Sequence, residues 1–389
     1  MKELQKIVGE GLRARASGQR AALATVVGIE GSGYRLPGAR MLIVDGRWVA
    51  GSISGGCLED DVVLRAREAL ARNEASVAVY DTTRDDDIVF GVGLGCKGVV
   101  TLLIEPLRTA EEGVDFLAFA KRCLEQRVSG LAATVVRADG STSTKAAMRL
   151  VLSDGAVDTD IVDSGLQALI HAELRSLTED TALKNLPSQS GTALVFLERI
   201  DPPTPLVIFG AGHDAMPVAR LAKELGWHVT LVDHRPAYAT RERFPHADTI
   251  VLGSPKEAAS KVALDADTLA LVMTHNYLRD MDWTQILLPS PVRYLGLLGP
   301  RKRTDSLLAD LKEKGFQPSP EQLARLYAPV GLDIGSEGPA EVAMSILAEM
   351  QAVLTEHDGG HLRARKQPIH QRRDGTSQPS MHDRRAERV

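Results

Sequence analysis

The chain of 389 residues is poor in cysteine, in aromatic side chains and in long apolar runs. Its 3 cysteines cannot form a disulfide framework, and they lack the Cys-x-x-Cys spacing of structural zinc sites and thioredoxin-like redox sites. No apolar run is long enough to span a membrane, and the N-terminal segment lacks the apolar core of a signal peptide. We therefore expect a cytoplasmic globular protein.

The chain also lacks a strong excess of charge of either sign. The formal net charge is -5, from 46 Lys and Arg against 51 Asp and Glu, and it gives no general electrostatic reason to bind nucleic acid. A length of 389 residues favours two or three domains. Residues 201–205 predict a linker, because the three prolines there interrupt helices and ladders.

On either side of this linker the sequence pattern differs. We predict an N-terminal α+β domain over residues 1–200, a Rossmann-like domain over residues 206–356 and a disordered basic tail over residues 357–389. In the first domain, Asp45-Gly46 predicts the turn of a hairpin between residues 41–44 and 48–53. A second hairpin is expected to pair residues 132–137 with 148–152, and no internal repeat is evident.

The second domain shows short apolar segments separated by helix-length stretches. Such alternation predicts a doubly wound parallel sheet with helices on both faces. The predicted strands are residues 206–209, 228–232, 249–252, 269–273 and 294–298.

A glycine-rich turn follows the first of these strands. Gly210 and Gly212 permit a tight turn and a close approach of the backbone to a phosphate, with His213 at the start of the next helix. Asp233 ends the second strand, where an acid commonly binds a ribose hydroxyl pair. Arg235 leaves a 2′-phosphate as the alternative.

Two further groups of residues follow later strands of the same sheet. Arg301 and Arg303 begin a helix, where an anion would relieve their mutual repulsion. His275 follows the fourth strand and is a candidate acid, base or ligand, with a structural role as the alternative. Ligands of open α/β sheets collect at this edge.

The N-terminal domain holds unusual glycine-rich loops. Ser54, Gly55, Gly56 and Cys57 precede a predicted helix, where consecutive N–H groups can hold an anionic ligand. Cys96 lies in a second such loop, beside a lysine that favours thiolate. Both cysteines are candidate nucleophiles or soft-metal ligands, and filling a tight turn is the alternative for each. Cys123 is expected in the core.

Eight segments, taken in order, carry a resemblance. They are Gly31-Ser-Gly-Tyr-Arg-Leu-Pro-Gly-Ala-Arg-Met41, Gly51-Ser-Ile-Ser-Gly-Gly-Cys-Leu-Glu59, Gly93-Leu-Gly-Cys-Lys-Gly98, Phe209-Gly-Ala-Gly-His213, Val232-Asp-His-Arg-Pro236, Met273-Thr-His275, Gly296-Leu-Leu-Gly299 and Pro329-Val-Gly-Leu-Asp-Ile-Gly335. The sequence resembles the XdhC and CoxI family, the accessory factors of xanthine dehydrogenase and carbon monoxide dehydrogenase.

The resemblance implies a chaperone that binds molybdenum cofactor, protects it while a terminal sulfur is installed, and inserts it into a molybdenum hydroxylase of the xanthine dehydrogenase type. It implies a cysteine desulfurase-like sulfur donor and a homodimer. Cys57 and Cys96 become candidate contacts to molybdenum or its sulfur, and the cofactor is molybdopterin or its dinucleotide form.

Two other functions stay open. The glycine turn and Asp233 also suit an NAD(P)-dependent oxidoreductase, for which His275 is the candidate acid or base. An interaction protein with an empty Rossmann-like half is the third interpretation. For the leading interpretation, we expect the loops of Cys57 and Cys96 and the Gly210 turn to face a common cleft.

Overall fold

A computed structural model describes the chain except for residues 32, 82–97, 141–142, 190 and 367–389. The fold divides into two compact units, and the division falls after Pro202, inside residues 201–205. Of the predicted tail, residues 357–366 are described and include the 3-10 helix Leu362–Ala364, and the remainder lies outside the described residues.

The N-terminal unit contains two five-stranded antiparallel sheets. Sheet A has the strand order β3-β2-β1-β5-β4, and sheet B has the order β8-β7-β6-β10-β9. The elements of the first half are α1 (Lys2–Ala16), β1 (Ala21–Gly31), β2 (Arg40–Val44), β3 (Arg47–Gly51), α2 (Glu59–Arg72), β4 (Ser76–Asp81) and β5 (Gly98–Pro106). Those of the second are α3 (Phe116–Gln126), β6 (Gly130–Ala138), β7 (Arg149–Ser153), β8 (Ala156–Thr159), α4 (Ser164–Arg175), β9 (Thr181–Ser188) and β10 (Gly191–Ile200).

The two halves are an internal repeat, so the expectation of no repeat was wrong. We call α1 to β5 the first repeat and α3 to β10 the second repeat. Both run helix, three strands, helix, two strands, and their strands pair in the same order. The signal in the sequence is short: Arg40-Met-Leu-Ile-Val-Asp-Gly46 corresponds to Arg149-Leu-Val-Leu-Ser-Asp-Gly155.

The backbone repeats at these positions as well. Asp45 and Asp154, which open the two hairpin turns, both have positive φ, 47° and 50°. Gly38 and Ala147 also share positive φ, and the N–H of each donates to a carbonyl of the repeat's first strand, Val26 or Val135. The correspondence therefore extends from strand order to single hydrogen bonds.

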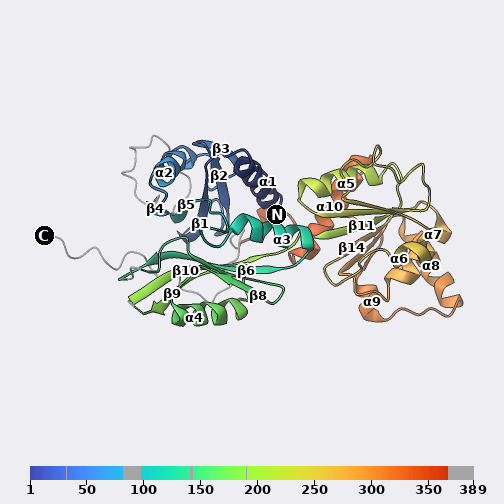
Figure 1. Cartoon of the computed structure of the whole chain (residues 1–389). Coiled ribbons are helices and arrows are strands. Elements are labelled where there is room, and N and C mark those ends of the chain that lie inside the picture. The colour runs from blue at the N-terminus through green and yellow to red at the C-terminus, as the bar shows by residue number, and fades with distance from the viewer. Residues whose placement is uncertain (32, 82–97, 141–142, 190, 367–389) are drawn as a thin grey trace. The chain divides into compact units, whose positions relative to one another are not determined.

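Helices and sheets of the N-terminal unit form stacked layers. In Figure 1, α2 covers one face of sheet A and α4 covers one face of sheet B. A further buried cluster contains Leu23 and Leu42 of sheet A, Val151 of sheet B, and Phe116 and Leu117 of α3. The two repeats therefore share one apolar core between their sheets.

Two buried ion pairs join the sheets reciprocally. Arg40 on β2 of sheet A pairs with Glu198 on β10 of sheet B, and Arg149 on β7 pairs with Glu105 on β5. All four side chains are nearly inaccessible. The ring of Phe116 contacts both guanidinium groups, with its centroid 4.7 Å from Arg40 Cζ and 5.3 Å from Arg149 Cζ. Each repeat thus supplies the arginine for the other's glutamate.

The second unit is built on one six-stranded sheet. Its elements are β11 (Pro205–Phe209), α5 (Ala215–Glu224), β12 (His228–Asp233), β13 (Thr249–Leu252), α6 (Pro255–Ala259), β14 (Leu269–Val272), α7 (Tyr277–Leu287), β15 (Tyr294–Leu297), α8 (Arg301–Glu313), α9 (Pro320–Ala324), β16 (Leu326–Tyr327) and α10 (Pro339–Leu354). All strands are parallel, in the order β13-β12-β11-β14-β15-β16. Numbered along the chain this is 3-2-1-4-5-6, the order of dinucleotide-binding folds.

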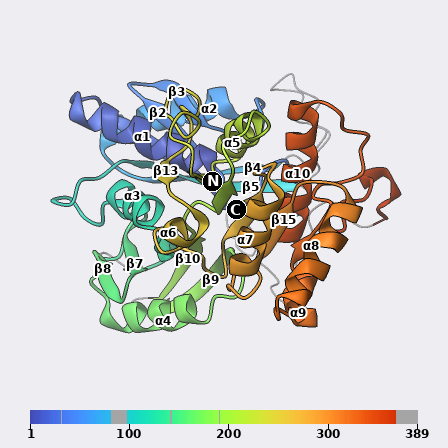
Figure 2. The ribbon, with the colours of Figure 1, turned by 90° about the vertical axis from the view of Figure 1, so that its right-hand side faces the viewer.

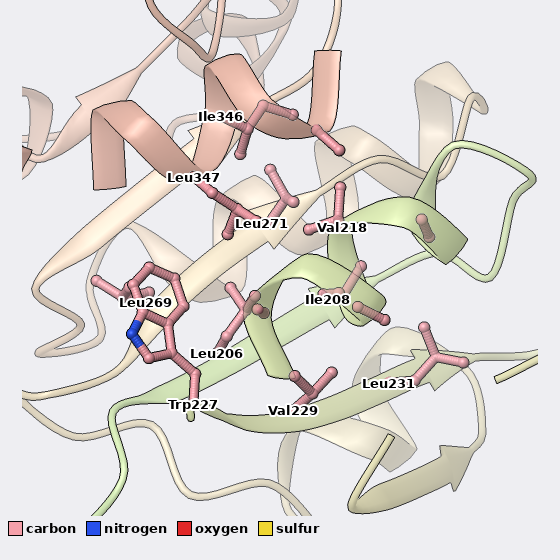
Figure 3. Close-up of a cluster of buried hydrophobic side chains, with 14 of the residues drawn as sticks. Leu206, Ile208, Val218, Trp227, Val229, Leu231, Leu269, Leu271, Ile346 and Leu347 are labelled. Atoms are coloured by element: carbon pink, nitrogen blue, oxygen red, sulfur yellow. The ribbon is translucent and has the colours of Figure 1, made fainter. Parts of the chain in front are cut away.

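Helices cover both faces of this sheet. On one face α5 and α10 pack on strand residues such as Ile208 and Leu271, as Figure 3 shows for part of the cluster. On the other face α6, α7 and α8 cover Val207 and Phe209, and α7 and α8 lie side by side in Figure 2. The predicted fold class, a doubly wound parallel sheet after an α+β domain, is confirmed.

Both predicted hairpins are confirmed, since β2 pairs with β3 and β6 pairs with β7. The strands β8 and β9 were not predicted. β9 lies at the edge of sheet B and contains Pro187, a residue that edge strands tolerate and that lowers strand propensity. Its side chains also lack the long apolar pattern of the inner strands.

Removal of one partner of a reciprocal ion pair tests its role in stability. Glu198→Gln leaves the buried Arg40 charge uncompensated, and we expect the free energy of unfolding to fall by about 3–5 kcal/mol. Glu105→Gln should cost a similar amount, and Arg40→Met with Glu198→Leu should cost less than Glu198→Gln. Urea unfolding followed by circular dichroism measures all three. A loss below about 0.5 kcal/mol for both glutamine variants would contradict the assignment.

Candidate functional site

Three loops of the first repeat start at the same end of sheet A. Strands β1, β3 and β4 run in one direction, because each is antiparallel to a neighbour that lies between them. The segments that follow them are residues 32–39, 52–58 and 82–97. Cys57 is in the second, and Cys96 is in the third, outside the described residues. The described residues that flank the third segment are anchored at this end, where Gly98 pairs with Gly31 and Asp81 with Val99.

The loop before α2 wraps around a carboxylate of its own chain. Glu59 accepts hydrogen bonds from the backbone N–H groups of Ile53, Ser54, Gly55, Gly56 and Leu58, at distances of 2.9–3.2 Å. The hydroxyls of Ser52 and Ser54 donate to it as well. The predicted anion cradle exists, and the anion in it is Glu59. Cofactor contacts by Ser54, Gly55 and Gly56 stay a prediction that requires Glu59 to be displaced.

These donors set the ionisation of Glu59. Burial alone would raise its pKa, but the hydrogen bonds from Ser54 and Ser52 outweigh this and lower the pKa to about 2. Glu59 is therefore a carboxylate at every physiological pH. This role of Glu59 was not predicted, although a glutamate just after a Ser-Gly-Gly turn could have indicated it.

Cys57 is exposed, while its backbone is fixed. Its N–H donates to Ser54 Oγ at 3.0 Å, and the same oxygen accepts from the N–H of Leu58. Tyr34 from the first loop lies against this turn, so closely that a Cβ on Gly55 would lie 2.7 Å from the Tyr34 ring. Tyr34 itself is 67% exposed. The thiol thus sits on a rigid turn beside an exposed aromatic ring, a neighbour that was not predicted.

Cys123 is buried in the core, as predicted, and burial raises the pKa of its thiol. Among the described residues, no group of three His, Cys, Asp or Glu side chains could hold a metal ion. None of the described helices has both the length and the apolar composition to cross a membrane.

The Gly210 turn requires glycine at its first position. Gly210 has φ +118°, and a Cβ there would lie 2.5 Å from the carbonyl oxygen of Met273. At Gly212 a Cβ would lie 3.4 Å from Cδ2 of His275, so His275 covers this side of the turn. Because the turn and the end of β14 touch, the glycines serve close packing of two strand ends in addition to any ligand contact.

Asp233 ends β12 as predicted, but its carboxylate is fully engaged. Oδ1 accepts from the N–H of Arg235 and from Arg235 Nε, both at 2.9 Å. Oδ2 accepts from Arg235 Nη2 at 2.7 Å and from the N–H of Ala211 at 2.6 Å. Burial would raise the pKa of Asp233, but these hydrogen bonds lower it overall. Both carboxylate oxygens therefore already have two donors.

His275 has a partner that the sequence did not indicate. Its Nε2 lies 3.1 Å from Oδ2 of Asp214, which precedes α5. His275 also has positive φ, 56°, an uncommon conformation for a residue with a side chain. His213 is exposed and lines a cavity of about 520 Å³ together with Met216, Arg220 and Phe244. A catalytic role for His275 stays a prediction.

The two predicted arginines of α8 differ. Arg303 pairs with the buried Asp280, which also accepts from the hydroxyl and the N–H of Thr274. Its guanidinium lies 5.3 Å from the ring centroid of Tyr277. Arg301 is exposed and has no ion pair with any residue that the structure describes. Arg303 therefore connects α8 to α7 and, through Asp280, to Thr274 just after β14, whereas Arg301 is accessible to a ligand.

A cavity of about 140 Å³ opens at the carboxyl ends of β11, β12 and β14. Its lining includes Gly210, Asp233, Arg235, Asn276, Arg279 and Trp283. Ligands of open α/β sheets bind at this position, where the strand order reverses. The predicted common cleft with Cys57 stays a prediction, because the two regions belong to separate units.

Comparison with known proteins decides the family. The model of the XdhC and CoxI family matches residues 14–81, and that of the XdhC Rossmann domain matches residues 206–350. A protein of Bacillus subtilis whose name describes it as a probable component of xanthine dehydrogenase is 34% identical over 85% of this chain and 92% of its own length. The chain belongs to the XdhC and CoxI family.

Two other relatives extend the comparison. The molybdenum cofactor insertion chaperone PaoD of Escherichia coli is 26% identical, over 88% of this chain and 86% of its own length. The crystal structure of a protein described as a xanthine dehydrogenase from Bacillus halodurans is 28% identical and superposes with a TM-score of 0.73. It covers 90% of this chain and 96% of that one, so the similarity includes both units.

The hydrogen bonds to Glu59 predict that wild type and Glu59→Gln differ in stability and that this difference depends on pH. Glu59→Gln removes a carboxylate from seven donors, and we expect the free energy of unfolding to fall by about 1–3 kcal/mol at neutral pH. The pKa of Glu59 is lower in the folded state than in the unfolded state. Its contribution to stability is therefore complete above pH 4.5 and is lost as the pH falls towards 2.

Urea unfolding of both proteins between pH 7 and pH 2.5 measures the difference. Glu68→Gln, an exposed glutamate on the same helix α2, is the matched control and should leave stability unchanged. A Glu59→Gln effect that persists undiminished in acid would contradict the anion-cradle assignment.

Proposed function

We propose that this protein is a molybdenum cofactor chaperone: it binds the cofactor, protects it during sulfuration, and inserts it into a molybdenum hydroxylase of the xanthine dehydrogenase type. Family membership supports this proposal, since one relative is named a molybdenum cofactor insertion chaperone and another a probable component of xanthine dehydrogenase. The observation that carries it is the exposed Cys57 thiol on a turn whose backbone is fixed by Ser54 and Glu59.

The cofactor is the cargo, and its chemistry matches the described residues. A molybdenum centre with sulfur ligands is soft, and a thiol is a suitable contact for it. Cys57 would hold this end, with Cys96 as the second predicted contact. Tyr34, exposed beside the same turn, offers an aromatic face to a planar pterin ring. In the Rossmann-like unit, the cavity beside Gly210 is lined by Arg235 and Arg279, which suit a phosphate group.

Rigidity of the Cys57 turn has a functional consequence. A chaperone must protect its cargo and then release it, so binding should not depend on folding of the site around the cargo. Seven hydrogen bonds to Glu59 order the turn in advance, so that cargo binding does not carry the entropy cost of ordering it. The sulfur donor and the hydroxylase would then reach an open thiol-bearing surface. We include a homodimer in the proposal.

An NAD(P)-dependent oxidoreductase is the second candidate, and the strand order with the Gly210 turn favours it. One observation weighs against it. Each oxygen of Asp233 already accepts two hydrogen bonds, which leaves neither oxygen free for a ribose hydroxyl pair. We therefore place cofactor insertion first.

Copurified cargo tests the proposal. Protein produced in molybdate-supplied cells should contain molybdenum and a pterin, and Cys57→Ala and Cys96→Ala should each lower the molybdenum content by about tenfold or more. Metal analysis measures molybdenum, and fluorescence after oxidation measures the pterin. Cys123→Ala, at a buried core position, is the matched cysteine control and should retain the cargo.

Equal molybdenum content in wild type, Cys57→Ala and Cys96→Ala would contradict thiol contact. Absence of both molybdenum and pterin from the wild-type protein would contradict the function itself. Native mass spectrometry of the same sample gives the mass of the bound species and the number of chains per complex in one measurement.

A further inference from the structure

The cavity at the end of β12 contains more positive charge than its acidic residues neutralise. Arg235 and Arg279 both line it, and Asp233 is its acidic lining residue. Asp233 is already paired with Arg235. The guanidinium of Arg279 makes no ion pair with any residue in the described part of the chain. An unneutralised guanidinium in a partly enclosed cavity attracts an anion.

Arg235 is held in position with one nitrogen to spare. Its Nε and Nη2 donate to Asp233, and its guanidinium lies 4.0 Å from the ring centroid of Tyr238. Nη1 takes no part in these hydrogen bonds. The side chain is 35% exposed. Asp233 therefore acts here as the residue that orients Arg235.

The same arrangement removes the acceptor that a ribose diol would need. In dinucleotide-binding folds the acid at the end of the second strand accepts hydrogen bonds from the two ribose hydroxyls. Here both oxygens of Asp233 are occupied by Arg235 and by the N–H groups of Ala211 and Arg235. A diol at this place would have to break a buried ion pair, whose side-chain carboxylate is only 2% exposed.

The volume of the cavity suits one chemical group of a larger ligand. About 140 Å³ is well above the roughly 15 Å³ that one water molecule requires. It is below the roughly 300–1,000 Å³ of cavities that enclose an entire small-molecule ligand. The lining combines Arg235, Arg279 and the amide of Asn276 with the buried indole of Trp283.

We propose that this cavity binds a phosphomonoester group through Arg235 and Arg279 and discriminates against a ribose diol. The proposal rests on the proposed function for the identity of the ligand that carries the phosphate. There it selects the nucleotide-free form of the pterin cofactor, which ends in a phosphomonoester, over the dinucleotide form, which presents a ribose diol.

Adenosine 2′-monophosphate and adenosine serve as probes of this preference. Adenosine 2′-monophosphate has a phosphate where adenosine has one hydroxyl of its diol, and the two are otherwise identical. Isothermal titration calorimetry with the full chain should show about tenfold or tighter binding of the 2′-monophosphate, and inorganic phosphate should compete with it. Quenching of Trp283 fluorescence would report binding at this cavity.

Variants separate the contributions of the two arginines. Arg279→Ala should weaken binding of the 2′-monophosphate by about tenfold and leave adenosine binding nearly unchanged. Arg235→Ala frees Asp233 and should reverse the preference in favour of the diol. Lys256→Ala removes a nearby exposed cation that does not line the cavity, and it should have no effect on the preference.

Equal affinity of the wild-type protein for the two probes would overturn the proposal, as would an unchanged preference in Arg279→Ala. Absence of binding by the 2′-monophosphate and by inorganic phosphate would also overturn it. The readouts are independent of cargo content: molybdenum in the purified protein with equal binding of the two probes refutes only this phosphate site. A preference for the 2′-monophosphate without molybdenum refutes only the chaperone function.

Discussion

Two arginines with their carboxylate partners connect the sheets of the N-terminal unit, and the first glycine-rich loop ends at one of these arginines. Arg40 begins β2 immediately after the first glycine-rich loop, and Glu198 holds it from the opposite sheet. Since Phe116 fills the space between Arg40 and Arg149, neither arginine can leave without exposing the ring or opening the core. The second repeat therefore fixes the end of this loop.

The repeats share a scaffold and differ in their loops. In the first repeat, β3 is followed by the Cys57 turn, and 16 residues, 82–97, separate β4 from β5. In the second repeat, the two residues 189–190 separate β9 from β10. The loops with both candidate thiols thus occur in one copy, while the other provides the packing surface and the ion-pair partners.

Much of the fold follows from local patterns. The Asp45-Gly46 turn and the alternation of strands and helices after Pro205 indicate elements whose pairing is then confirmed. The repeat was missed because its two halves share few residues and differ in the lengths of the segments between their strands. The same limit applies at the site. The residues near Asp233 in the sequence do not show that Arg235 donates to both of its carboxylate oxygens. An arginine two residues after the acid is compatible with an acid that binds a ribose diol and with one that is occupied by the arginine.

Covalent linkage of the two repeats gives them the geometry of a symmetric dimer within one chain. In such a dimer each copy uses the same surface patch against the other. Because both copies have the same sequence, every substitution appears in both. Here one chain carries both repeats and they can differ in sequence, while the effective concentration of each for the other is set by the connecting chain and stays constant on dilution. One copy can therefore remain a permanent support while the loops of the other diverge.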